Sequence, residues 1–361
     1  MEMFETESNV VVLNEQPEFS AAEQEEVSAS FFVLCEDDDA SQFGQSVYDY
    51  KVAGMSILNW VVRACASDPV VLKVSPDDNV LEIIKPYLKN TEYSVVLYAS
   101  TPLLNKGHLK DLLGFVYRKH MNACKLKKGY VLKNDYIVGV DDLYSIDTYD
   151  FASNDFFEVK NYGDLSLVQE ILEKKVLSYH KKNGVYFENE SQVAVDATTE
   201  IGYASVISAG VKILNHSSVN NNVKIGANSV VSNSKIGEDV VVGIGAVVEG
   251  CVIKDGAVVG DGVVLKNSVV GNNVVIGTGS VLIDSGIKDE AKIGDLARCS
   301  NVRLAENVHV GKACEIIGIE APVVIMRNTL VGSNVKIVDS NIAELSEIES
   351  NKIIVAGKKV N

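Results

Sequence analysis

Residues 242–277 read VGIGAVVEGCVIKDGAVVGDGVVLKNSVVGNNVVIG, and their spacing decides the fold. A glycine that follows Ile or Val recurs there every seventeen residues, and the same period extends over residues 225–316. The glycines in this register are Gly226, Gly243, Gly260, Gly277, Gly294 and Gly311. A fixed period of this size is typical of a fold in which each repeat packs on its neighbours.

The aliphatic residues inside each period are spaced by six, six and five residues, as in Val242, Val248, Ile253 and Val259. A six-residue step fits one short strand and one turn, so three steps make a triangular coil. Stacked coils pair their strands in parallel and bury one branched aliphatic residue per side, each worth about 1.5–3 kcal/mol. The sequence therefore predicts a parallel β-helix of hexapeptide repeats.

A second column of mostly small residues precedes the aliphatic position on the five-residue side. Its members are Ser234, Cys251, Ser268, Ser285 and Val302. We expect them at a tight corner of the coil, where a wide side chain would clash with its neighbours.

The period is interrupted once near its end. Gly332 follows Gly311 by twenty-one residues instead of seventeen, which indicates four inserted residues within 318–327. From Ile201 to Leu345 there is room for about eight coils. The last coil would be exposed, so it requires a cap or a partner.

Upstream of the repeats, strand-like and helix-like segments alternate. Apolar runs at 31–34, 70–74 and 94–98 predict strands, and amphipathic segments predict helices at 55–67, 79–88, 109–120 and 163–182. This order indicates an α/β layered domain with a largely parallel sheet. We expect an acidic disordered tail over 1–30, a shortened α/β domain over 31–160, a connecting helix and linker over 161–192, and a β-helix with a C-terminal cap over 193–361.

The composition is that of a globular protein, with 47% apolar residues and a net charge of −16. Residues 1–50 contain thirteen acidic residues and no Lys or Arg, which leaves −3 for residues 51–361. Binding of nucleic acid through a basic face is therefore disfavoured, and the tail is expected to be solvated or to act as an acidic docking segment. No apolar run reaches the roughly 18 residues that span a bilayer, and no signal-peptide pattern is present, so we expect a cytoplasmic protein without a membrane span.

Neither the cysteines nor most histidines form a recognisable site. The six cysteines lack CxxC or CxxH spacing, and Cys251 and Cys299 fall on coil positions where a small apolar residue fits. His108, His120 and His180 stand beside Lys or Arg and are expected on the surface.

An α/β domain, a connecting helix and a hexapeptide β-helix resemble, in this order, the bifunctional N-acetylglucosamine-1-phosphate uridylyltransferase/glucosamine-1-phosphate acetyltransferase family. The resemblance covers about residues 31–316. Its matching segments are 52–58 (VAGMSIL, family VxGKPML), 98–104 (YASTPLL, family YGDVPLL), 159–161 (VKN), 233–237 (NSKIG) and 309–311 (HVG) with Glu315. It implies a left-handed β-helix, a truncated Rossmann-like nucleotidyltransferase domain and a homotrimer.

The resemblance also implies a uridylyltransfer site, which needs donors around a triphosphate and a carboxylate that holds Mg²⁺. The family's glycine-rich phosphate loop corresponds to residues 35–40 (CEDDDA), whose four carboxylates would repel the substrate. The family's Mg²⁺-binding Asp corresponds to Ser100, and its loop lysine falls at about Ser46. Asn161, or its neighbour Lys160, is what remains of the metal-binding set.

The acetyltransferase half implies a base that deprotonates a sugar amine. Glu315 matches the family's ExK motif, but the lysine position of that motif is Ile317, and no His follows within residues 321–328. Only His216 and His309 lie in the β-helix, and for both a surface or turn role stands beside that of a base. His309 precedes an inward valine, so we expect its side chain on the outside.

Three functions remain open, and the first is favoured. A degenerate family member would keep the fold and act as a binding, scaffolding or regulatory subunit, as a homotrimer or with an active relative, with a sugar nucleotide as ligand. A hexapeptide acyltransferase would use His309, Glu315 and acetyl-CoA on a changed acceptor at a subunit interface. A sugar-1-phosphate nucleotidyltransferase would use a rebuilt Mg²⁺ site of Asp37, Asp39 and Asn161. Mg²⁺ and acetyl-CoA are expected only where the corresponding activity is retained.

Overall fold

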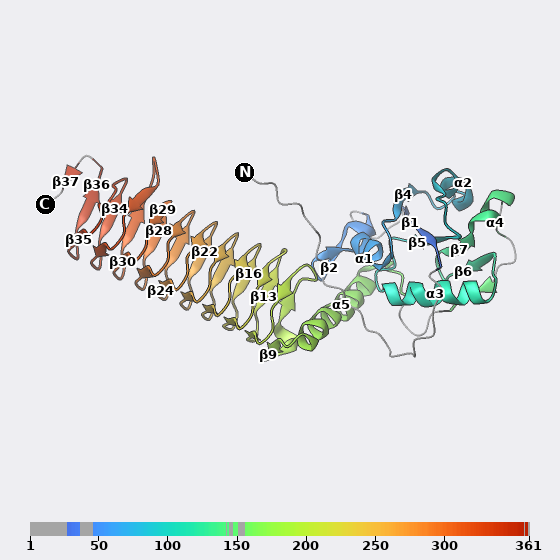
Figure 1. Cartoon of the computed structure of the whole chain (residues 1–361), viewed down its shortest axis with the longest axis horizontal. Coiled ribbons are helices and arrows are strands. Elements are labelled where there is room, and N and C mark those ends of the chain that lie inside the picture. The colour runs from blue at the N-terminus through green and yellow to red at the C-terminus, as the bar shows by residue number, and fades with distance from the viewer. Residues whose placement is uncertain are drawn as a thin grey trace. The chain divides into compact units, whose positions relative to one another are not determined.

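The structure is a computed structural model, and it describes residues 27–36, 46–141, 143, 147–150, 156–356 and 358–359. The chain divides into two compact units, and the division falls between Lys174 and Lys175. The first unit is an α/β domain and the second is a parallel β-solenoid, the general term for a β-helix (Figure 1).

The α/β unit alternates strands and helices from its first described residues. Its elements are β1 (Ala29–Glu36), β2 (Lys51–Val52), β3 (Met55–Ser56), α1 (Ile57–Ala64), β4 (Val70–Val74), α2 (Val80–Ile84), β5 (Tyr93–Tyr98), α3 (Lys106–Arg118), β6 (Ala123–Lys125), β7 (Tyr130–Lys133), α4 (Asn134–Gly139) and β8 (Asp147–Thr148), followed by α5 (Tyr162–Lys182), with short 3₁₀ turns at Val47–Asp49 and Lys85–Tyr87. Strand β1 begins at Ala29, and residues 1–26 of the predicted tail lie outside the described residues.

One six-stranded sheet forms the middle of this unit, in the order β4-β1-β5-β7-β6-β8. β1 pairs in parallel with both β4 and β5, as predicted, whereas β7 is antiparallel to β5 and β6. The sheet is therefore mixed. The β6–β7 hairpin was not predicted, because Lys125, Lys127 and Lys128 at and after the end of β6 are typical of a solvated loop.

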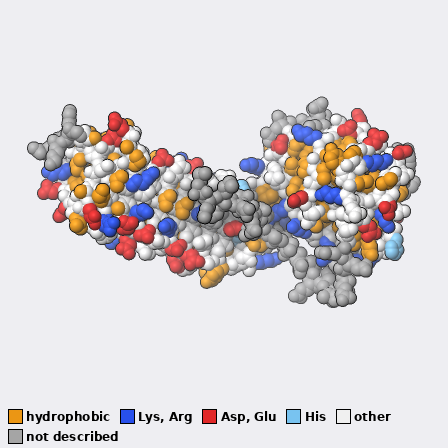
Figure 2. All heavy atoms as spheres, turned by 45° about the horizontal axis from the view of Figure 1, so that its top comes forward, with side chains coloured by type: hydrophobic (Ala, Val, Ile, Leu, Met, Phe, Trp, Pro, Cys, Tyr) orange, Lys and Arg blue, Asp and Glu red, His pale blue; other side chains and the backbone are white. Residues whose placement is uncertain are grey.

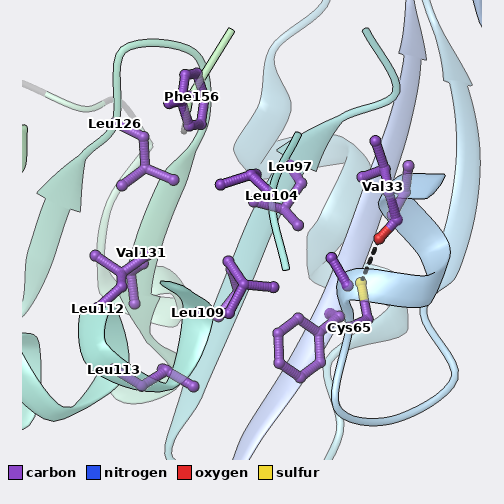
Figure 3. Packing of buried hydrophobic residues seen from close by; sticks show 14 of the residues in the cluster. Val33, Cys65, Leu97, Leu104, Leu109, Leu112, Leu113, Leu126, Val131 and Phe156 are labelled. Atoms are coloured by element: carbon purple, nitrogen blue, oxygen red, sulfur yellow. Dashed lines mark hydrogen bonds between the residues drawn. The ribbon is translucent and has the colours of Figure 1, made fainter. Parts of the chain in front are cut away.

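Both faces of the sheet are covered by apolar side chains. Along β1, Phe31 and Val33 join one buried cluster, while Phe32 and Leu34 join the other. In the first cluster, Leu109 and Leu112 of α3 lie close to Val131 of β7 (Figure 3). The alternation of sides along β1 is the period of two that a strand imposes.

Helix α5 buries one side along its length. Its buried residues Val168, Leu172, Val176 and His180 follow one another at intervals of four, which places them on one face of a helix. His180 is only 1% exposed, so the prediction that it lies on the surface is wrong. Its place in this four-residue series is a better guide than its lysine neighbours.

The solenoid has three sheets, here named faces 1 to 3. Face 1 consists of β9 (Tyr186–Phe187), β12 (Val206–Ile207), β15 (Lys224–Ile225), β18 (Val241–Val242), β21 (Val258–Val259), β24 (Val275–Ile276), β27 (Lys292–Ile293), β30 (His309–Val310), β33 (Leu330–Val331) and β35 (Glu347–Ile348). Its ten strands correspond to ten coils, more than the eight predicted. The first of them lies before residue 193, where the β-helix was predicted to begin.

Faces 2 and 3 complete each coil. Face 2 consists of β10 (Ala194–Val195), β13 (Lys212–Leu214), β16 (Val230–Ser232), β19 (Val247–Glu249), β22 (Val264–Lys266), β25 (Val281–Ile283), β28 (Arg298–Ser300), β31 (Glu315–Ile317), β34 (Lys336–Val338), β36 (Ile353–Val355) and β37 (Lys358–Lys359). Face 3 consists of β11 (Glu200–Ile201), β14 (Ser218–Val219), β17 (Lys235–Ile236), β20 (Val252–Ile253), β23 (Val269–Val270), β26 (Gly286–Ile287), β29 (Val302–Leu304) and β32 (Val323–Ile325). All solenoid strands pair in parallel except β37, which runs antiparallel to β36.

The predicted inward residues are buried and in register. Val242 pairs with Val259 on face 1, and Val248 with Leu265 on face 2. The inserted residues are where the period placed them. From face 2 to face 3 the chain advances by five positions from Cys299 to Leu304, but by nine from Ile316 to Ile325.

The column of small residues is buried at a corner, as predicted, but steric fit is only part of the reason. The Ser234 Oγ accepts a hydrogen bond from the backbone nitrogen of Cys251 in the next coil, at 3.0 Å. The same hydroxyl donates to the carbonyl of Ser232, at 2.7 Å. A hydroxyl in this column therefore supplies an acceptor to a buried backbone N–H of the next coil.

Among the described residues, no helix combines the length and the apolar character that crossing a membrane requires.

Candidate functional site

The first candidate site lies where β1 and β5 end. Because these strands are parallel, Glu36 at the end of β1 and Ser100 just after β5 lie at the same edge of the sheet. The backbone nitrogen of Val159 donates to the carbonyl of Ser100, at 2.9 Å, so the segment before α5 runs along this edge. Ligands of open α/β sheets bind at the carboxyl ends of the strands.

Asn161, the predicted metal ligand, caps helix α5. Its Oδ1 accepts a hydrogen bond from the backbone nitrogen of Asp164, at 3.0 Å. The Asp164 carboxylate accepts in return from the Asn161 side chain at 2.9 Å and from the backbone nitrogen of Lys160 at 2.9 Å. Both ends of the Asn161 amide are therefore engaged in capping.

Lys128, at the turn of the β6–β7 hairpin, occupies this edge. Its Nζ lies 2.6 Å from Glu36 Oε2 and 2.5 Å from Glu158 Oε1. The other oxygen of Glu158 lies 2.9 Å from Lys160 Nζ. The Lys128 Nζ also lies 4.8 Å from the centre of the Tyr98 ring, within cation–π range. Glu36 and Glu158 therefore each have an ammonium group beside them, and Lys128 has two carboxylates.

The pKa shifts of Glu158 and Lys128 both favour the charged form. Burial raises the pKa of Glu158, but hydrogen bonds and charges from Lys128 and Lys160 outweigh burial, so the net pKa is lowered. Burial lowers the pKa of Lys128, and its two glutamate partners outweigh that effect and raise it. Burial, followed by the charge of Glu36, raises the pKa of Tyr98 to about 12, so this phenol is neutral.

The cluster leaves little for a metal ion. In the described part of the chain no group of three His, Cys, Asp or Glu side chains could hold a metal. The Ser100 Oγ is buried and has no hydrogen-bond partner among the described residues. Asp37 and Asp39, the other predicted metal ligands, lie outside those residues, as does the rest of the acidic loop after Glu36.

The second candidate site lies on the outside of the solenoid. His309 is half-buried on face 1, and the neighbouring Val310 points inward with 4% exposure, as predicted. Lys292 and Leu330 flank His309 on the two adjacent strands. No hydrogen bond or ion pair joins the His309 side chain to any other described residue, so both ring nitrogens are open to a substrate.

Glu315 belongs to a different face. On face 2 it stands opposite Arg298 in one neighbouring strand and Lys336 in the other, and its Oε2 lies 2.6 Å from Lys336 Nζ. Ile317, at the expected lysine position, ends the same strand and is half-buried. The two predicted catalytic residues, His309 and Glu315, are therefore not brought together on one face.

The remaining solenoid candidates have structural roles. His216 is exposed in a turn with φ of 56°, and its backbone nitrogen contacts Thr198 Oγ1 at 3.3 Å. Cys299 points into the solenoid, where burial raises its pKa to about 12, so its thiol is inert at neutral pH. Packing is thus the role of Cys299, as its coil position predicts.

Three charged residues of these sites were not singled out in the sequence. Glu158 and Lys128 meet across thirty residues, and Lys128 and Glu36 across ninety-two, so no local pattern joins them. Lys292 was identifiable, because it stands one seventeen-residue period before His309 and therefore beside it in the stack.

Comparisons with known proteins give a limited similarity. No protein-family model and no curated protein matches the chain. Among solved structures, the chain is similar to UDP-N-acetylglucosamine acyltransferase from Campylobacter jejuni, with 16% identity, 47% of this chain and 60% of that chain covered, and a TM-score of 0.29. A second is the acetyltransferase described from Desulfovibrio desulfuricans, with 11% identity, coverages of 48% and 68%, and a TM-score of 0.19.

A third similar structure is perosamine N-acetyltransferase from Caulobacter crescentus, with 12% identity, coverages of 92% and 96%, and a TM-score of 0.12. The chain spans 60% of the length of the Campylobacter enzyme. At such values the substrates of these proteins are not transferred to this chain.

Proposed function

We propose that this protein is a hexapeptide-repeat acyltransferase whose reaction takes place on the outside of the solenoid at His309. The observation that carries the proposal is that the His309 side chain has no bonding partner in the described part of the chain and is accessible from outside the solenoid. His309 is half-buried, has no partner among the described residues and lies beside the ammonium-bearing Lys292. A general base must reach its substrate with a free nitrogen, and His309 satisfies this condition better than the exposed His216.

In acyl transfer, a base removes a proton from an amine or hydroxyl as that group attacks a thioester carbonyl, and the thiolate of CoA leaves. His309 would accept the proton at a ring nitrogen. Lys292, on the adjacent strand, would attract an anionic group of the donor or acceptor. Acetyl-CoA is the donor we propose, with an amino sugar or a sugar nucleotide as the acceptor.

Glu315 can take part in the proposed reaction only in an oligomer. Since it lies on another face of its own chain, it would reach His309 only from a neighbouring subunit. We therefore include a homotrimer of left-handed solenoids, or a mixed oligomer with an active relative, in the proposal. A trimer would place face 1 of one copy against face 2 of the next.

The α/β unit is proposed to bind or regulate rather than to transfer nucleotides. The Lys128 ammonium stands between Glu36 and Glu158, where it neutralises the carboxylates that Mg²⁺ would need. This supports, for the α/β unit alone, the hypothesis that it keeps the fold without nucleotidyltransferase activity. The competing hypothesis, a rebuilt nucleotidyltransferase site with Asp37, Asp39 and Asn161, predicts Mg²⁺-dependent binding of UTP.

The test measures release of CoA thiol from acetyl-CoA with a panel of amino sugars and UDP-amino sugars as acceptors. His309→Gln is expected to lower kcat by about 10²–10⁴-fold with an unchanged melting temperature. His216→Gln, which changes the other solenoid histidine, is the matched control and should retain activity. Turnover that survives His309→Gln sinks the proposed base. If the unaltered protein neither turns over nor binds acetyl-CoA, the acyltransferase proposal is wrong and a scaffolding role for the solenoid is supported.

A further inference from the structure

Strand β4 has one side without a strand partner. It pairs in parallel with β1, in a register from Phe32 opposite Val70 to Glu36 opposite Val74. No strand of the described residues pairs with its other side, because β4 ends the sheet. A row of backbone N–H and C=O groups is therefore available for another strand.

The apolar faces of the sheet are also incomplete at β4. Val33 of β1 is fully buried, whereas Val71, its partner in β4, is 45% exposed. On the opposite face, Val70 and Leu72 pack against the cluster of Phe32 and Leu34 but are only partly buried. Figure 2 shows hydrophobic side chains gathered on the face of this unit that carries β4 and α2 in Figure 1. An added strand at β4 would cover apolar surface on both sides of the sheet.

The N-terminal tail contains a segment with the required character. Residues 10–13 read VVVL, between Asn9 and Asn14, and Pro17 follows shortly after. Residues 1–26 otherwise carry eight acidic residues and no Lys or Arg. An unbroken run of β-branched and aliphatic residues is typical of a strand covered on both faces, and asparagine and proline are typical of its ends.

The tail can reach the edge. Residues 14–28 connect this segment to β1, and fifteen residues span up to about 50 Å when extended. The free side of β4 is two strand spacings from β1, about 10 Å. Because β1 and β4 are parallel, an antiparallel strand beside β4 would end at the same sheet edge at which β1 begins. That arrangement needs the shortest connection.

We propose that residues 10–13 of the same chain add to the free edge of β4 as an antiparallel strand. The tether keeps this segment at an effective concentration near millimolar, which favours it over a second copy of the chain. The exposed Lys73 of β4 would then lie beside the acidic tail and attract it. The tail thereby acts as a built-in cover for an edge that would otherwise pair with other chains.

Hydrogen exchange measured by mass spectrometry on the full chain tests this placement. Val12→Pro removes a backbone donor from the segment, and we expect the amides of residues 70–75 to exchange at least tenfold faster than in the unaltered protein. Ser8→Pro, outside the segment, is the matched control and should leave these amides unchanged. Peptides from β5 and α3 should exchange equally in all three proteins, which shows that the unit remains folded.

A synthetic peptide of residues 8–16, added to the Val12→Pro variant, should restore protection of residues 70–75. Equal exchange of these residues in the unaltered and Val12→Pro chains would overturn the proposal. Protection that increases with protein concentration would also overturn it, because that result assigns the edge to a second copy of the chain.

Discussion

The hydroxyl of Ser268 accepts a hydrogen bond from the backbone nitrogen of Ser285, 3.1 Å away and one coil further along the solenoid. Ser285 repeats the contact with Val302, at 3.3 Å, so the column is a ladder that links successive coils. Each hydroxyl also donates to a carbonyl two residues earlier in its own coil, as Ser268 does to Lys266 at 2.7 Å.

Ser268→Ala should destabilise the solenoid, because it leaves the Ser285 N–H buried without an acceptor. We expect the free energy of unfolding to fall by about 1–3 kcal/mol, measured by urea denaturation. Ser268→Cys should lose less, since Cys251 already fills this column and accepts from Ser268 at 3.4 Å. Ser300→Ala, on the outside of β28, should have no effect. Equal stability of the Ala and Cys variants would show that an acceptor atom at this position contributes nothing to stability.

Lys128→Met should destabilise the α/β unit, because it leaves Glu36 and Glu158 half-buried with less counter-charge while keeping the apolar stem. A loss of about 1–2 kcal/mol is expected, below the value for a fully buried pair. Lys127→Met changes the adjacent exposed lysine and should be neutral. A variant as stable as the unaltered protein would mean that the ion pairs contribute nothing net.

The same variant should alter the response to acid. Since the pKa of Glu158 is lowered in the folded state, its contribution to stability is present above the unfolded pKa of about 4.3 and is lost as pH falls through the folded pKa. Without Lys128 the folded pKa rises and this acid-dependent loss becomes smaller. Denaturation curves of Lys128→Met and Lys127→Met between pH 6 and pH 3 should therefore differ in slope, and parallel slopes would contradict the assignment.

His180 should make the protein sensitive to mild acid. Its ring nitrogens are buried without hydrogen-bond partners among the described residues, and burial lowers its pKa to about 4. In the unfolded state the histidine has a pKa of about 6.5 and is protonated first as the pH falls. The contribution of neutral His180 to stability is therefore fully present above a pH of about 6.5 and is lost as pH falls toward 4. The loss amounts to about 3 kcal/mol.

His180→Leu should remove this slope between pH 6.5 and pH 4, measured by urea denaturation at several pH values. His216→Asn, at an exposed turn with a left-handed backbone that Asn tolerates, should retain the slope. If His180→Leu keeps the slope, another group is responsible for it.

Gly286→Val should destabilise the solenoid although valine favours strands. An added Cβ would lie 3.0 Å from Arg303 Cδ, because the arginine stem lies across Gly286 and its Nη1 donates to the carbonyl of Asp284 at 2.7 Å. We expect a loss of about 1 kcal/mol in thermal unfolding, with most of it recovered in the double variant Gly286→Val and Arg303→Ala. Additive losses in the double variant would exclude this clash.

The solenoid could be predicted in detail because a strict period encodes contacts between neighbouring coils. The period predicted which residues point inward and where residues are inserted. The role of the serine hydroxyls depends on backbone groups that no sequence pattern shows. In the α/β unit, the Lys128 cluster joins three distant segments, so only the three-dimensional fold reveals it. The sequence marked Asn161 through a family motif, whereas its contacts are those of a helix cap.

The four extra residues between Ile316 and Ile325 leave the stack undisturbed on both sides. Ile316 still pairs with Ile337, and Leu304 with Ile325. Residues can therefore be added at this corner while the later coils keep their register. This makes the loop at 318–322 a natural grafting point, where foreign peptides could be displayed at a fixed height on a rigid rod.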